Sequence, residues 1–204
     1  MKLRHSPTSP YVRTVMATLH ETGQVGEVEL LPTNVWDSET DIARDNPLGK
    51  VPALILDDGT TYIDSSMICE YLDSLHDGHN LYPTPGPERW RALRLYWLAK
   101  GILDASVDRV VEIGRRPKDL QWPEWLRRRK TATARALDLL ESEVPDFPGD
   151  VTIGHVALGV ALGYLDFRFP ADEWRTDRPN LAAWYDDDFA RRPSMTATVP
   201  KDPA

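Results

Sequence analysis

The sequence predicts a mixed α/β domain followed by an all-helical domain, and three features of its 204 residues support this division. Up to about residue 80, short aliphatic runs typical of strands alternate with segments of helical spacing. Beyond that point only helical spacing occurs. Between the halves, residues 77–87 hold three prolines and two glycines, which exclude a helix or a central strand. We therefore expect domains at residues 1–78 and 87–204, with a linker over 77–87.

The N-terminal half is expected to fold in the order β-α-β-α-β-β-α. Strands are predicted at four short apolar runs: residues 1–5, 27–31, 53–56 and 60–63. Helices are predicted at three segments with apolar residues at helical spacing: residues 10–22, 38–44 and 65–75. The last two strands read as a hairpin across Asp57-Asp58-Gly59. Such an order gives a mixed sheet flanked by helices.

The C-terminal half is expected to be a helical bundle. Four segments have helical spacing: residues 88–113, 123–144, 152–167 and 180–191. The third is apolar nearly all round between Ile153 and Tyr164, which is typical of the buried centre of a bundle. Its glycines would allow neighbouring helices to approach closely.

Composition restricts the class of protein. The 41% hydrophobic content can supply a sizeable core, and no run approaches the roughly 18 apolar residues of a membrane span. The N-terminus lacks the apolar run of a signal peptide, so we expect a cytoplasmic protein. Residues 1–80 carry 5 Lys/Arg against 13 Asp/Glu, which argues against nucleic acid as a partner. The one basic run, residues 127–130, is interpreted as a solvated helix face.

The single cysteine, Cys69, excludes an intramolecular disulfide and a cage of thiolate metal ligands. It falls in the middle of a predicted helix and is expected to be buried and inert. The five histidines are scattered without paired spacing, so the sequence predicts no metal site.

Ser9-Pro10-Tyr11-Val12 opens the first predicted helix, at the place where a thioredoxin-like redox domain carries Cys-x-x-Cys. With a hydroxyl at the first position, this segment suits a thiol supplied by another molecule. The Ser9 hydroxyl can donate a hydrogen bond to a thiolate, and the positive end of the helix adds to this in lowering the thiol pKa. No histidine is placed by a sequence signature to act as a base, so a serine hydrolase is not supported.

Two further motifs follow. In residues 46–52, Asn-Pro-Leu-Gly-Lys-Val-Pro, Pro52 precedes a predicted strand, and the dipeptide by itself favours an ordinary trans bond. A cis bond would instead turn the Val51 backbone groups outward, where an extended peptide could pair with them. Asp64-Ser65-Ser66 stands at a strand-to-helix junction, where it can cap the helix or bind a carboxylate at the helix N-terminus.

These three motifs in this order, before a proline-rich linker and a helical half, resemble the glutathione transferase family over essentially the whole chain. Residues 163–168, Gly-Tyr-Leu-Asp-Phe-Arg, and the start Thr8-Ser-Pro-x-Val-Arg resemble, more narrowly, a bacterial subgroup of uncharacterised glutathione-transferase-like proteins. The resemblance implies a thioredoxin-like N-terminal domain, glutathione as co-substrate, and a homodimer.

The resemblance also implies a role for individual residues. Ser9 would hold the glutathione thiolate, and the Val51 backbone would pair with the cysteinyl unit. Asp64 and Ser65 would bind the γ-glutamyl amino and carboxylate groups, and Lys50 the glycyl carboxylate. For the second substrate it suggests residues near the pocket: Tyr11, Ile102, Val107 and Arg109. An acid on the long helix, Asp104 or Asp108, would reach the partner's glutathione.

The implied activity is that of a glutathione transferase in detoxification, which activates the thiol for attack on a small hydrophobic electrophile. The alternatives are a glutathione-dependent isomerase or dehalogenase, and a non-catalytic binding protein of the same fold. The chain departs from the family at the start of the buried helix, where Thr152-Ile-Gly-His155 replaces Ser/Thr-x-x-Asp. Thr152 can still cap this helix.

Overall fold

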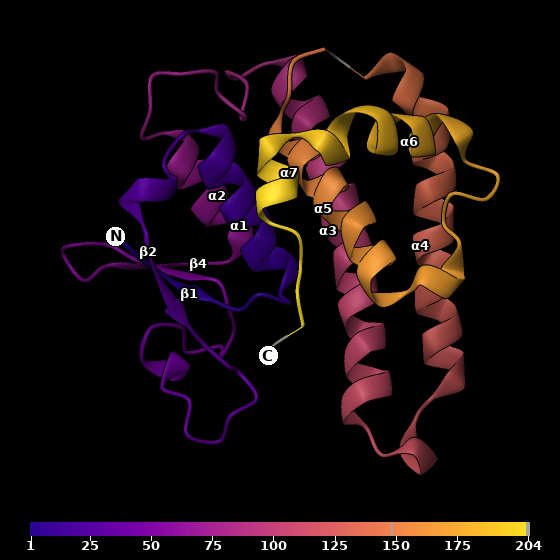
Figure 1. The fold of residues 1–204 in the computed structure, drawn as a ribbon, viewed down its shortest axis with the longest axis horizontal. Coiled ribbons are helices and arrows are strands. Elements are labelled where there is room, and N and C mark those ends of the chain that lie inside the picture. The colour runs from indigo at the N-terminus through magenta and orange to yellow at the C-terminus, as the bar shows by residue number, and fades with distance from the viewer. Residues whose placement is uncertain (148, 203–204) are drawn as a thin grey trace. The chain divides into compact units, whose positions relative to one another are not determined.

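The computed structural model describes residues 1–147 and 149–202. Contacts divide the chain into two compact units. The first is Met1–Gly86 together with the C-terminal residues from Pro193 onward, and the second is Pro87–Arg192 (Figure 1). The division at Pro87 coincides with the end of the expected linker, whereas the last residues group with the first unit instead of the helical one.

The first unit is built on a four-stranded mixed sheet with strand order β2-β1-β3-β4. The strands are β1 (Lys2–His5), β2 (Glu29–Pro32), β3 (Ala53–Ile55) and β4 (Thr61–Ile63). β1 pairs parallel with β2 and antiparallel with β3, and β3 pairs antiparallel with β4. Two helices, α1 (Pro10–Glu21) and α2 (Ser65–Asp73), pack against one another. The predicted α/β class is confirmed.

The short helix expected over residues 38–44 is reduced to one 3₁₀ turn, Ile42–Arg44. Upstream of it, the Asn34 and Asp37 side chains accept hydrogen bonds from the backbone N–H groups of residues 36 and 39. Such local bonds compete with helix formation, which explains why apolar spacing alone misjudged this segment.

The core of the first unit comes from the apolar faces of β1, β3, α1 and α2. Its fully buried side chains include Leu3, Val15, Leu19, Leu54, Ile68 and Leu72. At the end of α2, the buried Asp73 carboxylate accepts hydrogen bonds from the backbone N–H groups of Leu81 (2.7 Å) and Tyr82 (2.9 Å). This carboxylate therefore fixes the chain just before the proline-rich stretch.

A short C-terminal helix, α7 (Pro193–Ala197), packs on α1 and was not predicted. The buried Arg13 guanidinium donates through Nη2 to the Met195 carbonyl at 3.3 Å, and the Ser194 hydroxyl donates to the Glu21 carboxylate. These contacts join residues about 180 positions apart, which explains why the last segment belongs to the first unit.

The second unit is helical throughout its regular structure. It contains α3 (Pro87–Arg115), α4 (Pro123–Glu143), α5 (Ile153–Arg168) and α6 (Pro179–Ala183). α5 is buried from Ile153 to Leu165 and packs on α3, so the expected central helix is confirmed. A Cβ atom at Gly154 would lie 2.7 Å from the Ala92 carbonyl oxygen, so this close approach requires glycine.

The fourth expected helix, residues 180–191, is interrupted. After α6 the chain forms a π-helical turn, Trp184–Asp188, and then a 3₁₀ turn, Phe189–Arg191. Three consecutive aspartates, residues 186–188, have low helix propensity. The Asp186 carboxylate also accepts two hydrogen bonds of 2.7 Å from Arg175, a residue that precedes α6, and these bonds hold the turn in place.

The N-terminus of α5 is capped by a histidine in place of the usual acid. The Thr152 backbone N–H donates to His155 Nδ1 at 3.0 Å, so the imidazole must be neutral to accept. His155 is 3% exposed and lies against the rings of Phe147 and Trp184. Burial lowers the pKa of His155 to about 4, and the charge of Arg192 contributes in the same direction.

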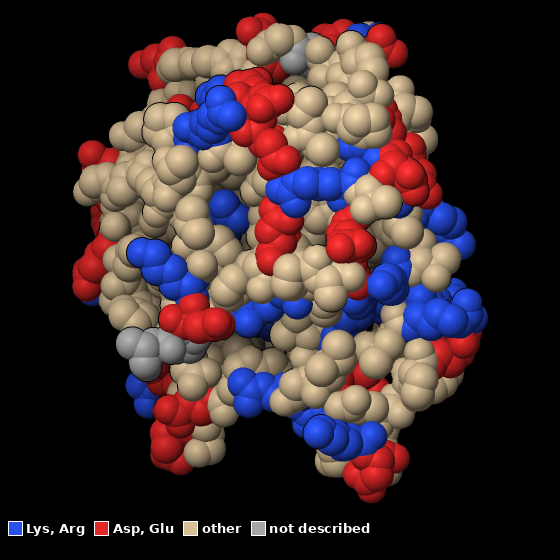
Figure 2. Space-filling view, turned by 45° about the vertical axis from the view of Figure 1, so that its right-hand side comes forward, with Lys and Arg blue, Asp and Glu red and all other residues tan. Residues whose placement is uncertain are grey.

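Acidic and basic side chains are mixed on the face drawn in Figure 2, where they do not form a continuous basic stripe. Within the basic run of α4, Arg127 pairs with Glu124 and Lys130 with Asp172. These pairs agree with a solvated, charge-compensated helix face.

Candidate functional site

The strand register brings the three sequence motifs to one end of the sheet. Arg4 of β1 is paired with Ala53 of β3, and Ala53 is paired with Ile63 of β4. Neighbouring strands lie about 4.8 Å apart, so the end of β1, the start of β3 and the end of β4 form one row. The segments that hold Ser9, Val51 and Asp64 leave the sheet at this row.

Ser9 is the N-cap of α1. Its backbone is extended, as is typical of an N-cap residue, and its Oγ accepts a hydrogen bond from the Val12 backbone N–H at 3.3 Å. The hydroxyl proton has no acceptor within the described part of the chain, and the side chain is half-buried. The oxygen is therefore bound to the helix while its O–H stays available to a ligand, at the positive end of the helix dipole.

The loop before β3 is shaped by Asn46, a residue to which the sequence analysis gave no role. Asn46 is 2% exposed; its amide nitrogen donates to the Lys50 carbonyl at 2.7 Å and its oxygen accepts from the Leu48 N–H at 3.0 Å. Gly49 has φ of 63°, a left-handed conformation that suits glycine. An Asn-Pro turn followed by glycine was the available signal for this role.

Two groups of this loop, the Lys50 ammonium and the Val51 backbone, have no partner among the described residues. The Val51–Pro52 peptide bond is cis, so the trans turn favoured by the dipeptide alone is wrong. Among residues 1–147 and 149–202, the N–H and C=O of Val51 make no hydrogen bond. The exposed Lys50 ammonium likewise forms no ion pair with a described residue.

Asp64 is the N-cap of α2, and its carboxylate accepts from the Ser66 N–H at 2.9 Å. Its φ of 66° is unusual for a residue with a side chain and costs about 1–3 kcal/mol. Such strain clusters at functional sites. The next residue, Ser65, is 3% exposed, and neither its N–H nor its hydroxyl has a partner in the described chain.

The pair of groups on Ser65 can therefore bind an anion at a helix N-terminus, beside the carboxylate of Asp64. Lys50, Val51, Asp64 and Ser65 thus combine a cation, an unpaired backbone strand, a carboxylate and two donors. This set matches a small zwitterionic peptide with free charged ends.

Of the other expected residues, Tyr11 is half-buried in the first turn of α1, which Ser9 caps. Five residues of α3 belong to the second unit: Ile102, Asp104, Val107, Asp108 and Arg109. Of these, Ile102 and Arg109 are buried, and the Arg109 guanidinium is bound to Asp172 at 2.6 Å.

Cys69 is fully buried, and burial raises the pKa of its thiol to about 12. It accepts a hydrogen bond from the Thr18 hydroxyl, so the prediction of an inert cysteine agrees with the structure. The described residues contain no group of three or more His, Cys, Asp or Glu able to hold a metal ion. Nor does any helix within this part of the chain have the length and apolar character needed to cross a membrane.

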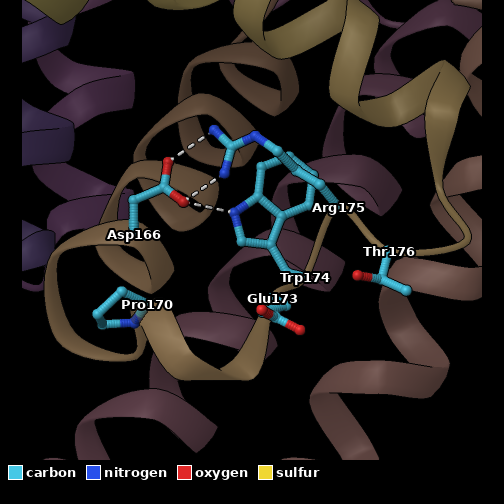
Figure 3. A pocket seen from close by; sticks show the side chains of 6 residues that line it. All are labelled: Asp166, Pro170, Glu173, Trp174, Arg175 and Thr176. Carbon is cyan, nitrogen blue, oxygen red and sulfur yellow. Dashed lines mark hydrogen bonds and ion pairs between the residues drawn. The ribbon is translucent and has the colours of Figure 1, made fainter.

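The second unit contains a cavity of about 340 Å³ (Figure 3). It is lined by residues around the end of α5: Asp166, Pro170, Glu173, Trp174, Arg175 and Thr176. Asp166 accepts from Trp174 Nε1 at 2.7 Å and from both Nη atoms of Arg175 at 2.6 and 2.9 Å. The main polar groups of the cavity wall therefore bind one another. Asp166, the acid of the Gly163–Arg168 motif, has a structural role: it holds Trp174 and Arg175 in place.

A four-stranded mixed sheet with these caps, joined to a helical unit around a buried central helix, defines a thioredoxin-like domain followed by an all-helical domain. The pattern of the glutathione S-transferase N-terminal domain matches residues 3–80, and that of the C-terminal domain matches residues 123–187. The chain belongs to the glutathione transferase family.

Its relatives include an uncharacterised GST-like protein, YibF, of Escherichia coli K12, which is 35% identical over 205 residues that cover 98% of this chain and 100% of that protein. A glutathione transferase family member from Pseudomonas fluorescens Pf-5, solved with bound glutathione, is 46% identical with a TM-score of 0.94 over 98% of each chain. A structure from the same source with bound S-(propanoic acid)-glutathione is 46% identical with a TM-score of 0.90, over 98% of this chain and 100% of that one.

Proposed function

We propose that this protein is a glutathione transferase that binds glutathione at the sheet end described above and uses its thiolate to attack a small hydrophobic electrophile. The observation that carries the proposal is the convergence of Ser9, Val51 and Ser65, each with an unused hydrogen-bonding group, at one row of the sheet. A relative that is 46% identical was solved with bound glutathione, and this supports glutathione as the ligand.

Each part of glutathione finds a complementary group. The γ-glutamyl carboxylate binds the N–H and hydroxyl of Ser65, and its amino group binds the Asp64 carboxylate. The cysteinyl backbone pairs with the N–H and C=O of Val51 as a neighbouring strand would. The glycyl carboxylate meets the Lys50 ammonium. The thiol then lies at Ser9.

The Ser9 hydroxyl donates a hydrogen bond to the thiolate, and the α1 N-terminus adds a favourable potential. Both favour the charged form of the sulfur, so the thiol pKa falls and more thiolate is present near neutral pH. The thiolate sulfur forms a bond to the electrophilic carbon, and a leaving group departs with the electron pair of the bond that breaks. The enzyme contributes activation and proximity without a covalent intermediate. Tyr11, in the same first turn, contacts the second substrate.

The test is a titration of the purified protein with glutathione, in which the thiolate absorbance is followed as pH is varied. We expect the pKa of the bound thiol to fall well below the value of about 8.5 for a free cysteine. Ser9→Ala should raise that pKa by about 1–2 units, which corresponds to the free energy of one hydrogen bond to a charged group. The variant should still bind glutathione, but its turnover should be lower.

Ser38→Ala, at an exposed position of the first unit, serves as the control and should leave the thiol pKa unchanged. Ser9→Ala also removes a helix cap worth about 1 kcal/mol, so its unfolding free energy is measured in parallel. A bound thiol with the pKa of free glutathione would refute activation by Ser9.

Two alternatives use the same site. A glutathione-dependent isomerase or dehalogenase needs the same thiolate but yields an isomerised product or a halide ion, which product analysis with halogenated and unsaturated substrates would reveal. A non-catalytic binding protein would bind glutathione without lowering the thiol pKa, and Ser9→Ala would leave its biological role intact. The S-(propanoic acid)-glutathione bound to the Pseudomonas relative is a thioether of the kind that conjugation produces, and this favours the transferase.

We also propose that the protein is a cytoplasmic homodimer with a role in detoxification. Trp90 and Trp97 of α3 are 71% and 55% exposed, and their spacing of seven residues places them on one helix face. An exposed face of this kind is suited to burial against a second copy. Sedimentation analysis should give a dimer for the wild type and a monomer for Trp97→Glu, whereas Trp122→Glu, on α4's N-terminal side, should remain dimeric.

A further inference from the structure

The segment that follows α7 runs along α1 toward the end of the helix that Ser9 caps. Near the start of α7, the Ser194 hydroxyl donates to the carboxylate of Glu21, the last residue of α1. Four residues later, the Thr198 hydroxyl accepts a hydrogen bond from Arg13 Nε at 3.4 Å. The chain therefore passes along α1 in the direction opposite to that of the helix, as Figure 1 shows for its yellow end.

The contact with Arg13 brings this segment within reach of Ser9. Arg13 lies one helical turn after Ser9, which is about 6 Å along the helix at about 1.5 Å per residue. A helical side chain also points back toward the helix N-terminus, so the Arg13 guanidinium covers the turn that begins at Ser9. The residues beyond Thr198 can each advance the chain by about 3.3 Å. Residues 199–201 therefore reach the level of the Ser9 hydroxyl.

Residues 199–201 carry an apolar side chain and a cation to this end of α1. Residues 199–202 form neither helix nor strand, and Pro200 disfavours a helical conformation of Val199 before it. The Val199 side chain is 53% exposed. The Lys201 side chain is also exposed, and its ammonium forms no ion pair with a described residue. Both side chains are therefore available to a molecule that lies beside Ser9.

We propose that Lys201 binds a carboxylate of the second substrate, so that the preferred electrophiles are small organic acids. The two carboxylates of glutathione already have partners in Ser65 and Lys50, which leaves the Lys201 ammonium for the other reactant. Its flexible four-carbon stem lets the charge follow a carboxylate close to the reacting carbon. Val199 offers apolar surface to the rest of the molecule. This role of Lys201 depends on the glutathione site proposed above.

The test compares two glutathione adducts that differ in one charge. S-carboxymethylglutathione carries a carboxylate one carbon from the sulfur, and S-carbamoylmethylglutathione carries an uncharged amide of nearly the same shape. Calorimetric titration of the full-length protein should show tighter binding of the carboxylate adduct by about two- to fivefold, the range expected for an exposed ion pair. Equal affinities for the two adducts, or tighter binding of the amide, would overturn the proposal.

Variants assign the preference to Lys201. Lys201→Gln removes the charge and should abolish the preference for the carboxylate adduct, whereas Lys118→Gln, at an exposed position of the second unit, should keep it. Unmodified glutathione should bind both variants as tightly as it binds the wild type. A preference that persists in Lys201→Gln would refute the role of Lys201 alone. Failure of unmodified glutathione to bind the wild type would refute the glutathione site and, with it, this role.

Discussion

Acidification is expected to destabilise this protein through His155, the histidine that caps α5. Its neutral ring accepts the Thr152 N–H, and burial lowers its pKa from the usual 6.5 to about 4. As pH falls below 6.5 the unfolded chain takes up a proton that the folded chain still excludes, so stability is lost on the acid side. The loss reaches about 2 kcal/mol near pH 5 and about 3 kcal/mol below pH 4, at 1.36 kcal/mol per pKa unit.

The assay is urea unfolding of the wild type and His155→Asn at several pH values from about 7.5 to about 5. The asparagine amide oxygen can accept the same Thr152 N–H but does not titrate, so all other ionisable groups cancel in the difference between the two proteins. We expect that difference in unfolding free energy to change by about 2 kcal/mol over this range, to the disadvantage of the wild type at low pH. A difference that stays constant with pH would refute the reasoning.

Three further changes probe packing and burial. Asp73→Ala should lower the unfolding free energy in urea titrations by about 2–4 kcal/mol, because it leaves two buried backbone N–H groups unpaired. Ser74→Ala, at the adjacent exposed position, is the control and should lower it much less. Gly154→Ala should lower the midpoint of thermal unfolding by an amount corresponding to about 1–3 kcal/mol, since the new Cβ would lie 2.8 Å from the Leu95 Cβ. An unchanged midpoint would mean that α3 and α5 can move apart. Cys69 should react with a disulfide reagent only as fast as the protein unfolds, and rapid reaction of the folded protein would contradict its burial and its raised pKa.

Ser9, Asp64 and Ser65 of the candidate site could be predicted from the sequence because their signals are local. Ser9 before Pro10 at a helix start, and Asp64 before Ser65 at another, are capping patterns that a few residues determine. The prediction that Cys69 is buried and inert also used a local signal, its position in the middle of an amphipathic helix. The role of Asn46 was missed because its effect lies in two hydrogen bonds across the loop that residue types alone do not specify.

The sequence by itself determined the order of the four strands and of helices α1 to α5, and the buried character of α5, since hydrophobic periodicity reports which face of each element avoids water. Tertiary structure decided what depends on residues far apart in the chain. The register of β1, β3 and β4 brings the three motifs to one row, and α7 is attached to α1 through Arg13. Hydrogen bonds and burial between such distant segments leave no periodic trace in the sequence, so only the folded chain reveals them.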